Sequence, residues 1–290
     1  MKVTGFTIVR NAIKYDYPAV EAITSVLPLC DEFVVAVGKS DDDTLALIQS
    51  IDSDKISIIE TVWDESLKTG GRVLAVETDK AIAAITPDTT WAFYIQCDEV
   101  VHEKYYENIR LAMQQYEHDM AVEGLLFKYT HFYGSFNYVA DSRKWYRNEI
   151  RIIRNTKNVA SYRDAQGFRK LDNTKLYVKP IDAYIYHYGW VRPPQKMAEK
   201  VRSFHTLWHT QDEIDKMQLD TTDFDYSKID SLRIFEYTHP KVMQKRIESA
   251  SWNFKFNVAE KKYSLKNKVL FFIEKLTGWR IGEYKNYKVI

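Results

Sequence analysis

The most suggestive chemistry in this sequence is a group of polar side chains that follows an apolar run. Residues 91–95 read WAFYI, and Gln96, Cys97, Asp98 and Glu99 come directly after them. A short aromatic and branched run predicts a buried strand, so the two carboxylates would stand at its carboxyl end. Open α/β sheets bind ligands at that edge. Adjacent carboxylates there repel each other unless a cation or hydrogen-bond donors compensate, and we therefore expect a divalent metal ion.

A histidine far along the chain supports the metal hypothesis. His187 lies in the segment YIYHYGW, at the end of another strand-like run. An imidazole would complete the coordination of Mn²⁺, and a nucleotide-bound Mn²⁺ or Mg²⁺ takes only one or two protein carboxylates besides phosphate oxygens. The alternatives are that Asp98 or Glu99 caps a helix near Lys104 and that His187 is a core residue.

Strand-like and helix-like segments alternate through the first hundred residues. The expected strands are Val3–Val9, Phe33–Val37, Ile56–Ile59 and Trp91–Ile95, with helical patterns between them. This alternation predicts an α/β protein with a mostly parallel, Rossmann-like central sheet flanked by helices. Right-handed crossovers would bring the ends of these strands to one edge, where their polar residues form one site.

Two further segments at that edge carry polar residues. Asp42 and Asp43 lie in the acidic turn KSDDDT, where they either accept hydrogen bonds from ribose hydroxyls or cap the following helix. Arg72 follows Gly70 and Gly71 just before a helical pattern. A helix start of this kind favours diphosphate oxygens, although a glycine pair is also an ordinary turn.

Asp164 is the candidate general base. It lies in the polar, loop-like stretch SYRDAQGFRK, where a carboxylate would face a hydroxyl acceptor. The alternative is a solvated loop aspartate, and Asp141 and Glu149 are rivals for the same role.

Composition limits the class of protein. The chain has 290 residues, of which 45% are hydrophobic, so it can form a substantial core. Its 41 lysines and arginines nearly balance 40 aspartates and glutamates, which argues against nucleic acid as a partner. Two cysteines are too few for a disulfide framework. With no signal-like start and no long apolar run, we expect a cytoplasmic protein.

The end of the chain has a different character. Pro193-Pro194 predicts a boundary between a domain at residues 1–194 and a mainly helical C-terminal extension at residues 195–290. Tyr263–Trp279 combines an apolar face with lysines. This segment either packs on the domain or places residues 263–290 on an anionic membrane surface.

Taken in order, these motifs resemble the family 2-like glycosyltransferases of the GT-A fold, including bacterial members. The resemblance covers about residues 1–195 and rests on Asn11, the turn ending at Thr44, Gly71-Arg72, Gln96–Glu99, RNEIRIIRN, the Asp164 loop and YHYGW. It implies that Asp98 matches the last aspartate of the family's metal-binding DxD motif and that His187 completes the metal site. It also implies that Val9 and Asn11 lie at the nucleobase and that Asp164 is the base.

The resemblance implies an activity as well. This activity is the metal-dependent, inverting transfer of a sugar from a UDP- or GDP-sugar to a saccharide or lipid-linked saccharide. Its setting would be bacterial surface-polysaccharide or lipopolysaccharide synthesis, in the cytoplasm or on the inner face of the membrane. Two departures are Gln96, in place of the first DxD aspartate, and Val37, where an aspartate often reads the base. They keep open a non-catalytic sugar-nucleotide or carbohydrate-binding protein, whereas a nucleotidyltransferase would show a more glycine-rich start.

Overall fold

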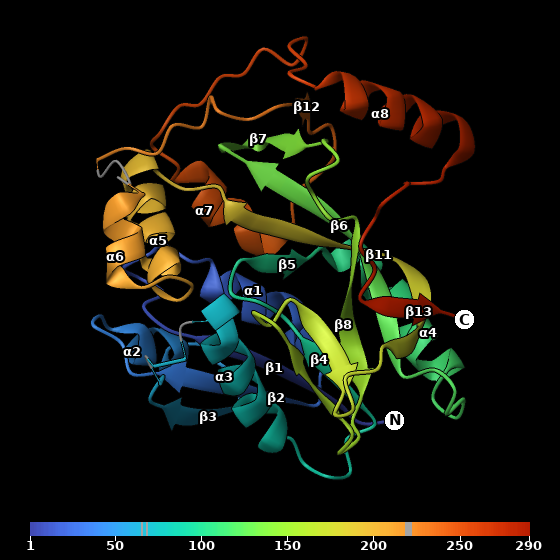
Figure 1. Cartoon of the computed structure of the whole chain (residues 1–290). Helices are drawn as coiled ribbons and strands as arrows, with labels where there is room; N and C mark the ends of the chain where they lie inside the picture. The colour runs from blue at the N-terminus through green and yellow to red at the C-terminus, as the bar shows by residue number, and fades with distance from the viewer. Residues whose placement is uncertain (65, 68, 218–221) are drawn as a thin grey trace.

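The computed structural model describes residues 1–64, 66–67, 69–217 and 222–290, and its centre is a large curled sheet with helices around it (Figure 1). The first half of the chain forms four parallel strands in the order β3-β2-β1-β4. They are β1 (Val3–Val9), β2 (Glu32–Gly38), β3 (Ile56–Thr61) and β4 (Trp91–Tyr94). The helices between them are α1 (Ala19–Val26), α2 (Thr44–Gln49) and α3 (Arg72–Ala83). The predicted α/β class is confirmed.

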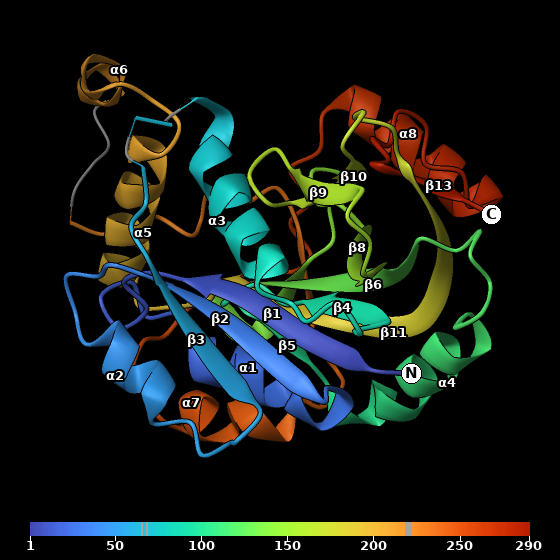
Figure 2. The ribbon, with the colours of Figure 1, turned by 90° about the horizontal axis from the view of Figure 1, so that it is seen from below.

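Both faces of this parallel region are covered, as the apolar sequence of β2 requires. Phe33, Val35 and Val37 point into the core layer that contains α1. Val34 and Ala36 point into the opposite layer, which contains α3. Figure 2 shows α3 on one side of the strands and α1 and α2 on the other.

The chain beyond Tyr94 extends the sheet with both antiparallel and parallel strands. β8 pairs antiparallel with β4 and β6, and β7 and β12 continue the sheet beyond β6. The long strand β11 pairs parallel with β6 and carries β5 and β13. These strands are β5 (Glu99–Val101), β6 (Gly124–Tyr133), β7 (Ser135–Ala140), β8 (Asn148–Arg154), β11 (Leu176–Trp190), β12 (Leu232–Ile234) and β13 (Tyr287–Val289). The sheet as a whole is therefore mixed, and its parallel part is the region that presents strand ends to the site.

A small hairpin and five further α-helices complete the described part of the fold. The hairpin of β9 (Val159–Tyr162) and β10 (Gly167–Lys170) holds the Asp164 loop at its tip. The helices are α4 (Tyr106–Gln115), α5 (Pro194–Thr206), α6 (Gln211–Lys216), α7 (Gln244–Glu248) and α8 (Leu265–Thr277). No helix in the described ranges is long and apolar enough to cross a membrane.

The predicted boundary coincides with the start of a helix. α5 begins at Pro194, and proline suits a first helical turn because its missing N–H has no partner there in any case. However, β12 and β13, which lie beyond this point, pair with β7 and β11 in the main sheet. The division into residues 1–194 and 195–290 stays a prediction.

Candidate active site

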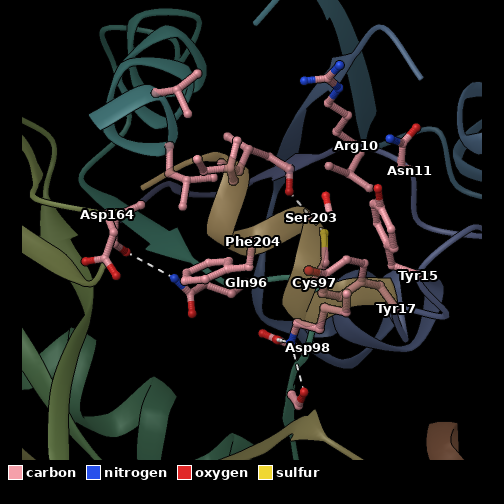
Figure 3. Close-up of a pocket in the computed structure, with 18 of the residues that line it drawn as sticks. Arg10, Asn11, Tyr15, Tyr17, Gln96, Cys97, Asp98, Asp164, Ser203 and Phe204 are labelled. Carbon is pink, nitrogen blue, oxygen red and sulfur yellow. Dashed lines mark hydrogen bonds and ion pairs between the residues drawn. The ribbon is translucent and has the colours of Figure 1, made fainter. Parts of the chain in front are cut away.

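A cavity of about 720 Å³ lies where β1 and β4 end, and α5 supplies part of its wall (Figure 3). Its lining also includes the Asp164 loop and the end of β11. The predicted site residues found in this lining are Val9, Asn11, Gln96, Asp98, Asp164 and His187. Residues that are far apart in the sequence therefore meet at one edge of the sheet, and the crossover argument predicted this for Asn11, Gln96 and Asp98.

Asp98 forms an ion pair with a lysine that the sequence analysis did not single out. Lys200 Nζ lies 3.1 Å from Asp98 Oδ2 and donates to the carbonyl oxygen of Gly189 at 2.8 Å. His187 Nε2 lies 3.8 Å from the same Asp98 oxygen. Position 189 requires glycine, because an added Cβ would stand only 2.5 Å from His187 Nε2 and 2.7 Å from Asp98 Oδ2.

The charges around Asp98 keep it ionised. Burial alone would raise its pKa, but Lys200, His187 and Arg192 together hold the Asp98 pKa well below its usual range. Burial also lowers the pKa of His187, against the attraction of Asp98. For Lys200, burial and the Arg192 charge lower the pKa to about 8, against the attraction of Asp98.

Glu99 points away from the cavity. Its carboxylate binds Arg151 in a bidentate pair, with two nitrogen–oxygen distances of 2.7 Å, and accepts a hydrogen bond from the hydroxyl of Tyr129 at 2.7 Å. It also accepts from the backbone N–H of Gln96 at 3.2 Å and so closes the turn that carries Asp98. Glu99 therefore shapes the site from the core side and is not available to a ligand.

Asp164 reaches the cavity from a strained turn. Its neighbours Arg163 and Ala165 both have positive φ, at 57° and 61°, which is uncommon for residues with a side chain. Gln96 supports the turn by donating to the carbonyl oxygen of Ala165 at 3.1 Å. Gly71 also contacts it, because an added Cβ would lie 2.9 Å from Asp164 Cβ. Burial raises the pKa of Asp164, which suits a proton acceptor.

The rival carboxylates do not line the cavity. Asp141 pairs with Lys261 at 3.0 Å and accepts a hydrogen bond from Ser231. Glu149 is almost fully buried, and burial raises its pKa to about 7. Of these three carboxylates, Asp164 is the one that the fold brings to the cavity.

Polar and aromatic side chains occupy the opposite side of the cavity. Figure 3 shows Arg10, Asn11 and Tyr15 across from Asp164, with Asp98 between the two groups. Asn11 adopts a φ of 53° and its side-chain oxygen accepts from the backbone N–H of Asp41 at 2.8 Å. The guanidinium of Arg10 lies 5.4 Å from the centre of the Trp63 ring. Planar rings and amide groups of this kind suit a nucleoside.

Three predicted residues are not brought to the cavity. Asp42 accepts from the backbone N–H of Thr44 at 3.0 Å and of Lys14 at 2.6 Å, so its carboxylate fixes the turn before α2. Asp43 and Arg72 are exposed. Asp41, one residue earlier in the acidic turn, lines the cavity in their place.

A divalent metal was predicted at Asp98 and His187, but these residues do not fit one well. The described part of the chain contains no group of three or more His, Cys, Asp or Glu side chains that could hold a metal ion. Glu99 is engaged by Arg151, and the oxygen of Asp98 that faces His187 already contacts the Lys200 ammonium. A dication at that oxygen would meet a like charge at close range.

Comparison with known proteins gives only distant similarities. No protein-family model and no curated protein matches this chain in sequence. Similar solved structures include a fragment of S. aureus TarS, 14% identical, with a TM-score of 0.40 over 75% of this chain and 69% of that chain. The same fragment in complex with UDP is 13% identical and has a TM-score of 0.39. Against a longer TarS structure, this chain spans 39% of the length.

A second similar structure is glucosyl-3-phosphoglycerate synthase from Mycobacterium tuberculosis. That structure contains Mn²⁺, UDP and phosphoglyceric acid. It is 14% identical, with a TM-score of 0.31 over 45% of this chain and 43% of that chain. Similarities this weak carry no argument for an activity, which has to come from the site itself.

The residue that sequence reasoning missed does have a signal in the sequence. Met197, Lys200, Val201 and Phe204 recur at helical spacing, and all four line the cavity. A lysine on the apolar face of a helix would bury its charge. This is unfavourable unless the face meets a polar site that pairs with the ammonium. This position would therefore have distinguished Lys200 from Lys196, the other lysine of the same helix.

Proposed function

We propose that this chain is a glycosyltransferase that moves a sugar from a nucleoside-diphosphate sugar to a hydroxyl acceptor. Support comes chiefly from one observation, the common cavity of Asp164, the Asp98–Lys200 pair and the aromatic, amide-bearing segment after β1. Its volume lies within the range of about 300–1,000 Å³ that is usual for small-molecule sites.

In this proposal each side of the cavity has a separate task. The nucleoside binds near Asn11 and Tyr15, the diphosphate lies by Lys200, and the sugar faces Asp164. Asp164 accepts the proton of the acceptor hydroxyl as its oxygen bonds to the anomeric carbon. The bond from that carbon to the diphosphate oxygen breaks, and the leaving diphosphate takes the electron pair. Attack from the face opposite the diphosphate inverts the anomeric centre.

Several finer parts of the proposal come from the sequence resemblance. They are a UDP- or GDP-sugar as donor, a saccharide or lipid-linked saccharide as acceptor, and a role in bacterial surface-polysaccharide or lipopolysaccharide synthesis. Metal dependence belongs to the same group. Mn²⁺ or Mg²⁺ at Asp98 and His187 would require Lys200 to leave Asp98, and removal of metal with EDTA tests this requirement.

The test is nucleotide release from UDP-, GDP- and CDP-sugars by the wild-type protein and by Asp164→Asn. The substitution should lower release about 10²- to 10⁴-fold, the usual contribution of a general base, and leave nucleotide binding intact. Asp141→Asn, a change outside the cavity, is the matched control and should release nucleotide at the wild-type rate. Wild-type protein that binds a nucleotide but never releases one would instead favour a non-catalytic sugar-nucleotide-binding protein.

A further inference from the structure

The immediate surroundings of Asp98 carry more positive than negative charge. The Lys200 ammonium lies 3.1 Å from the Asp98 carboxylate, and Arg192 adds a second positive charge close to it. Arg192 is fully buried, lies 4.8 Å from the centre of the Tyr17 ring and has an Nε atom without a hydrogen-bond partner among the described residues. An anion at this place would meet one net positive charge before any metal ion binds.

The Lys200 ammonium is held in a position from which it can also bind a ligand. Its ammonium has three N–H donors, of which Asp98 and the carbonyl of Gly189 take two among the described residues. The side chain is only 15% exposed and the ammonium lies 5.1 Å from the centre of the Tyr17 ring, so its position is well defined. The remaining donor is available to an acceptor in the cavity.

We propose that Lys200 supplies the positive charge that binds the diphosphate of the donor, in the place where a divalent metal was predicted. This inference rests on the proposed function. Asp98 is then a positioning residue, which holds the ammonium at the cavity wall and does not bind metal. As the bond to the anomeric carbon breaks, the electron pair moves to a diphosphate oxygen and Lys200 stabilises the charge that develops there.

Two substitutions separate a lysine-based from a metal-based site, because the two predict opposite results. If Asp98 holds a metal, Asp98→Asn abolishes nucleotide binding and Lys200→Met does not weaken it. If Lys200 binds the diphosphate, Lys200→Met weakens binding of UDP or GDP about tenfold or more, as expected for a lost charged hydrogen bond. Asp98→Asn then weakens this binding less than Lys200→Met does, because the lysine remains although its charged anchor is lost.

The measurement is calorimetric titration of the full chain with UDP and with GDP, in EDTA and in MnCl₂. We expect similar wild-type affinity in the two buffers. The matched control is Lys196→Met, one turn earlier on α5, whose side chain is 39% exposed and pairs with Glu199. Lys200→Arg, which keeps the charge, should retain most of the affinity, and thermal unfolding of each variant shows whether it folds.

Wild-type binding that requires Mn²⁺ and disappears in EDTA would overturn the lysine proposal and leave the glycosyltransferase proposal intact. So would normal affinity in a folded Lys200→Met variant. No binding of UDP or GDP by the wild-type chain in either buffer would instead contradict the proposed function itself. The two failures are therefore distinguishable.

A second, independent inference concerns α8. Leu265, Val269, Phe272 and Leu276 follow one another at spacings of four, three and four residues and are 58–81% exposed. Trp279 continues the row just beyond the helix. In Figure 1, α8 lies at the outside of the molecule, beyond β7 and β12. An apolar row on the outer side of a helix at the periphery has no covering element in the described chain.

The orientation of α8 is fixed by its inner face. Glu274 pairs with Arg143 and, at 3.3 Å, with Arg147, and Phe271 packs on Tyr263 with ring centres 4.8 Å apart. Lys266, Lys268 and Lys275 are exposed on the same helix, which has Glu274 as its single acid. The free face is therefore apolar and basic, and this combination matches an anionic lipid surface.

We infer that the outer face of α8 docks on anionic membrane. The test is co-sedimentation with phosphatidylcholine vesicles that contain or lack phosphatidylglycerol. Phe272→Ser/Leu276→Ser should lower binding to the anionic vesicles about tenfold or more, since two large apolar side chains no longer enter the bilayer. The control, Met120→Ser/Tyr237→Ser, removes two equally exposed apolar side chains elsewhere and should bind normally.

High salt should weaken the vesicle binding, because part of the attraction is electrostatic. Equal binding of the wild type and the α8 variant would overturn the inference. A wild-type dimer in solution that the α8 substitutions convert to a monomer would also overturn it, because a second copy of the chain would then cover this face.

Discussion

Two adjacent carboxylates at the end of the turn after β4 have opposite surroundings. Asp98 faces the cavity and pairs with Lys200, and both side chains keep 14–15% of their surface exposed. Glu99 faces the core and pairs with Arg151, and both are completely buried. Asp98 lies in the turn and Glu99 begins β5, so the sequence neighbours belong to two different environments.

The two ion pairs also differ in what they leave open to a ligand. Arg151 gives Glu99 two hydrogen bonds, Tyr129 gives a third, and no part of this carboxylate reaches the cavity. Lys200 is shared between Asp98 and a backbone carbonyl and keeps a donor for another partner. A buried guanidinium pair thus maintains the fold beneath a lysine pair that can respond to a ligand.

The largest expected loss of stability comes from a substitution on the core side of the turn, at the Glu99–Arg151 pair. Arg151→Met leaves the Glu99 carboxylate buried without its partner and should lower the free energy of unfolding by about 3–5 kcal/mol. Lys200→Met should lower it less, by about 1.5 kcal/mol, because Asp98 borders the cavity and can regain water. Urea unfolding of both variants measures the difference.

The double variant Glu99→Met/Arg151→Met is the control for this comparison. It removes both charges and should recover most of the lost stability. Equal losses for Arg151→Met and Lys200→Met would show that the two sides of the turn are not different environments.

The second effect concerns how Asp164 is positioned on the cavity side. Gly71→Ala places a Cβ 2.9 Å from Asp164 Cβ, at a φ of 68°. The displaced carboxylate should slow nucleotide release by about tenfold to a hundredfold, as small misplacements of catalytic groups do. Gly70→Ala is the control, because its φ of 65° gives similar backbone strain and its Cβ meets nothing within 4 Å. Similar release by both variants would exclude a positional effect on Asp164.

The third prediction concerns the pH dependence of nucleotide release, which distinguishes the two carboxylates Asp164 and Asp98 of the cavity. Burial raises the pKa of Asp164, whereas the neighbouring cations hold the Asp98 pKa well below its usual range. A base works only when deprotonated, so release should fall on acidification at a pH above the value of about 3.9 for an ordinary aspartate. Asp98 remains ionised there and does not contribute. A pH profile of kcat/KM measures this, and an acid limb at or below the ordinary aspartate value would contradict the role of Asp164.

Much of the fold follows from the sequence because local patterns determine it. Continuous apolar runs predicted the parallel strands, and the crossover rule predicted that Asn11, Gln96 and Asp98 would share one edge. The later strands were harder to predict from the sequence. β5 and β13 have three residues each, and both depend on pairing with β11, which is distant in the chain.

The candidate site was predictable to the extent that strand ends determine it. Lys200 was missed because its partner lies 102 residues away and only the packing of α5 brings the two together. The orientation of the Glu99 side chain could not be predicted from the sequence either. Its partner Arg151 is placed by the antiparallel pairing of β8 with β4 and β6. Asp42 shows a different case, in which a residue that fits a binding role accepts hydrogen bonds from the backbone of Thr44 and Lys14 and lies outside the cavity lining.

The smallest expected effect tests the hydrogen bonds that Asp42 accepts from the backbone of Thr44 and Lys14. Asp42→Ala removes the acceptor for the backbone N–H groups of Thr44 and Lys14 and should lower the free energy of unfolding by about 1 kcal/mol, as the loss of a helix cap does. UDP and GDP should bind with unchanged affinity, because Asp42 does not line the cavity. Asp41→Ala is the informative partner, since Asp41 does line it. Weaker nucleotide binding by Asp42→Ala than by Asp41→Ala would show that Asp42 contacts the nucleotide and that the binding site extends toward α2.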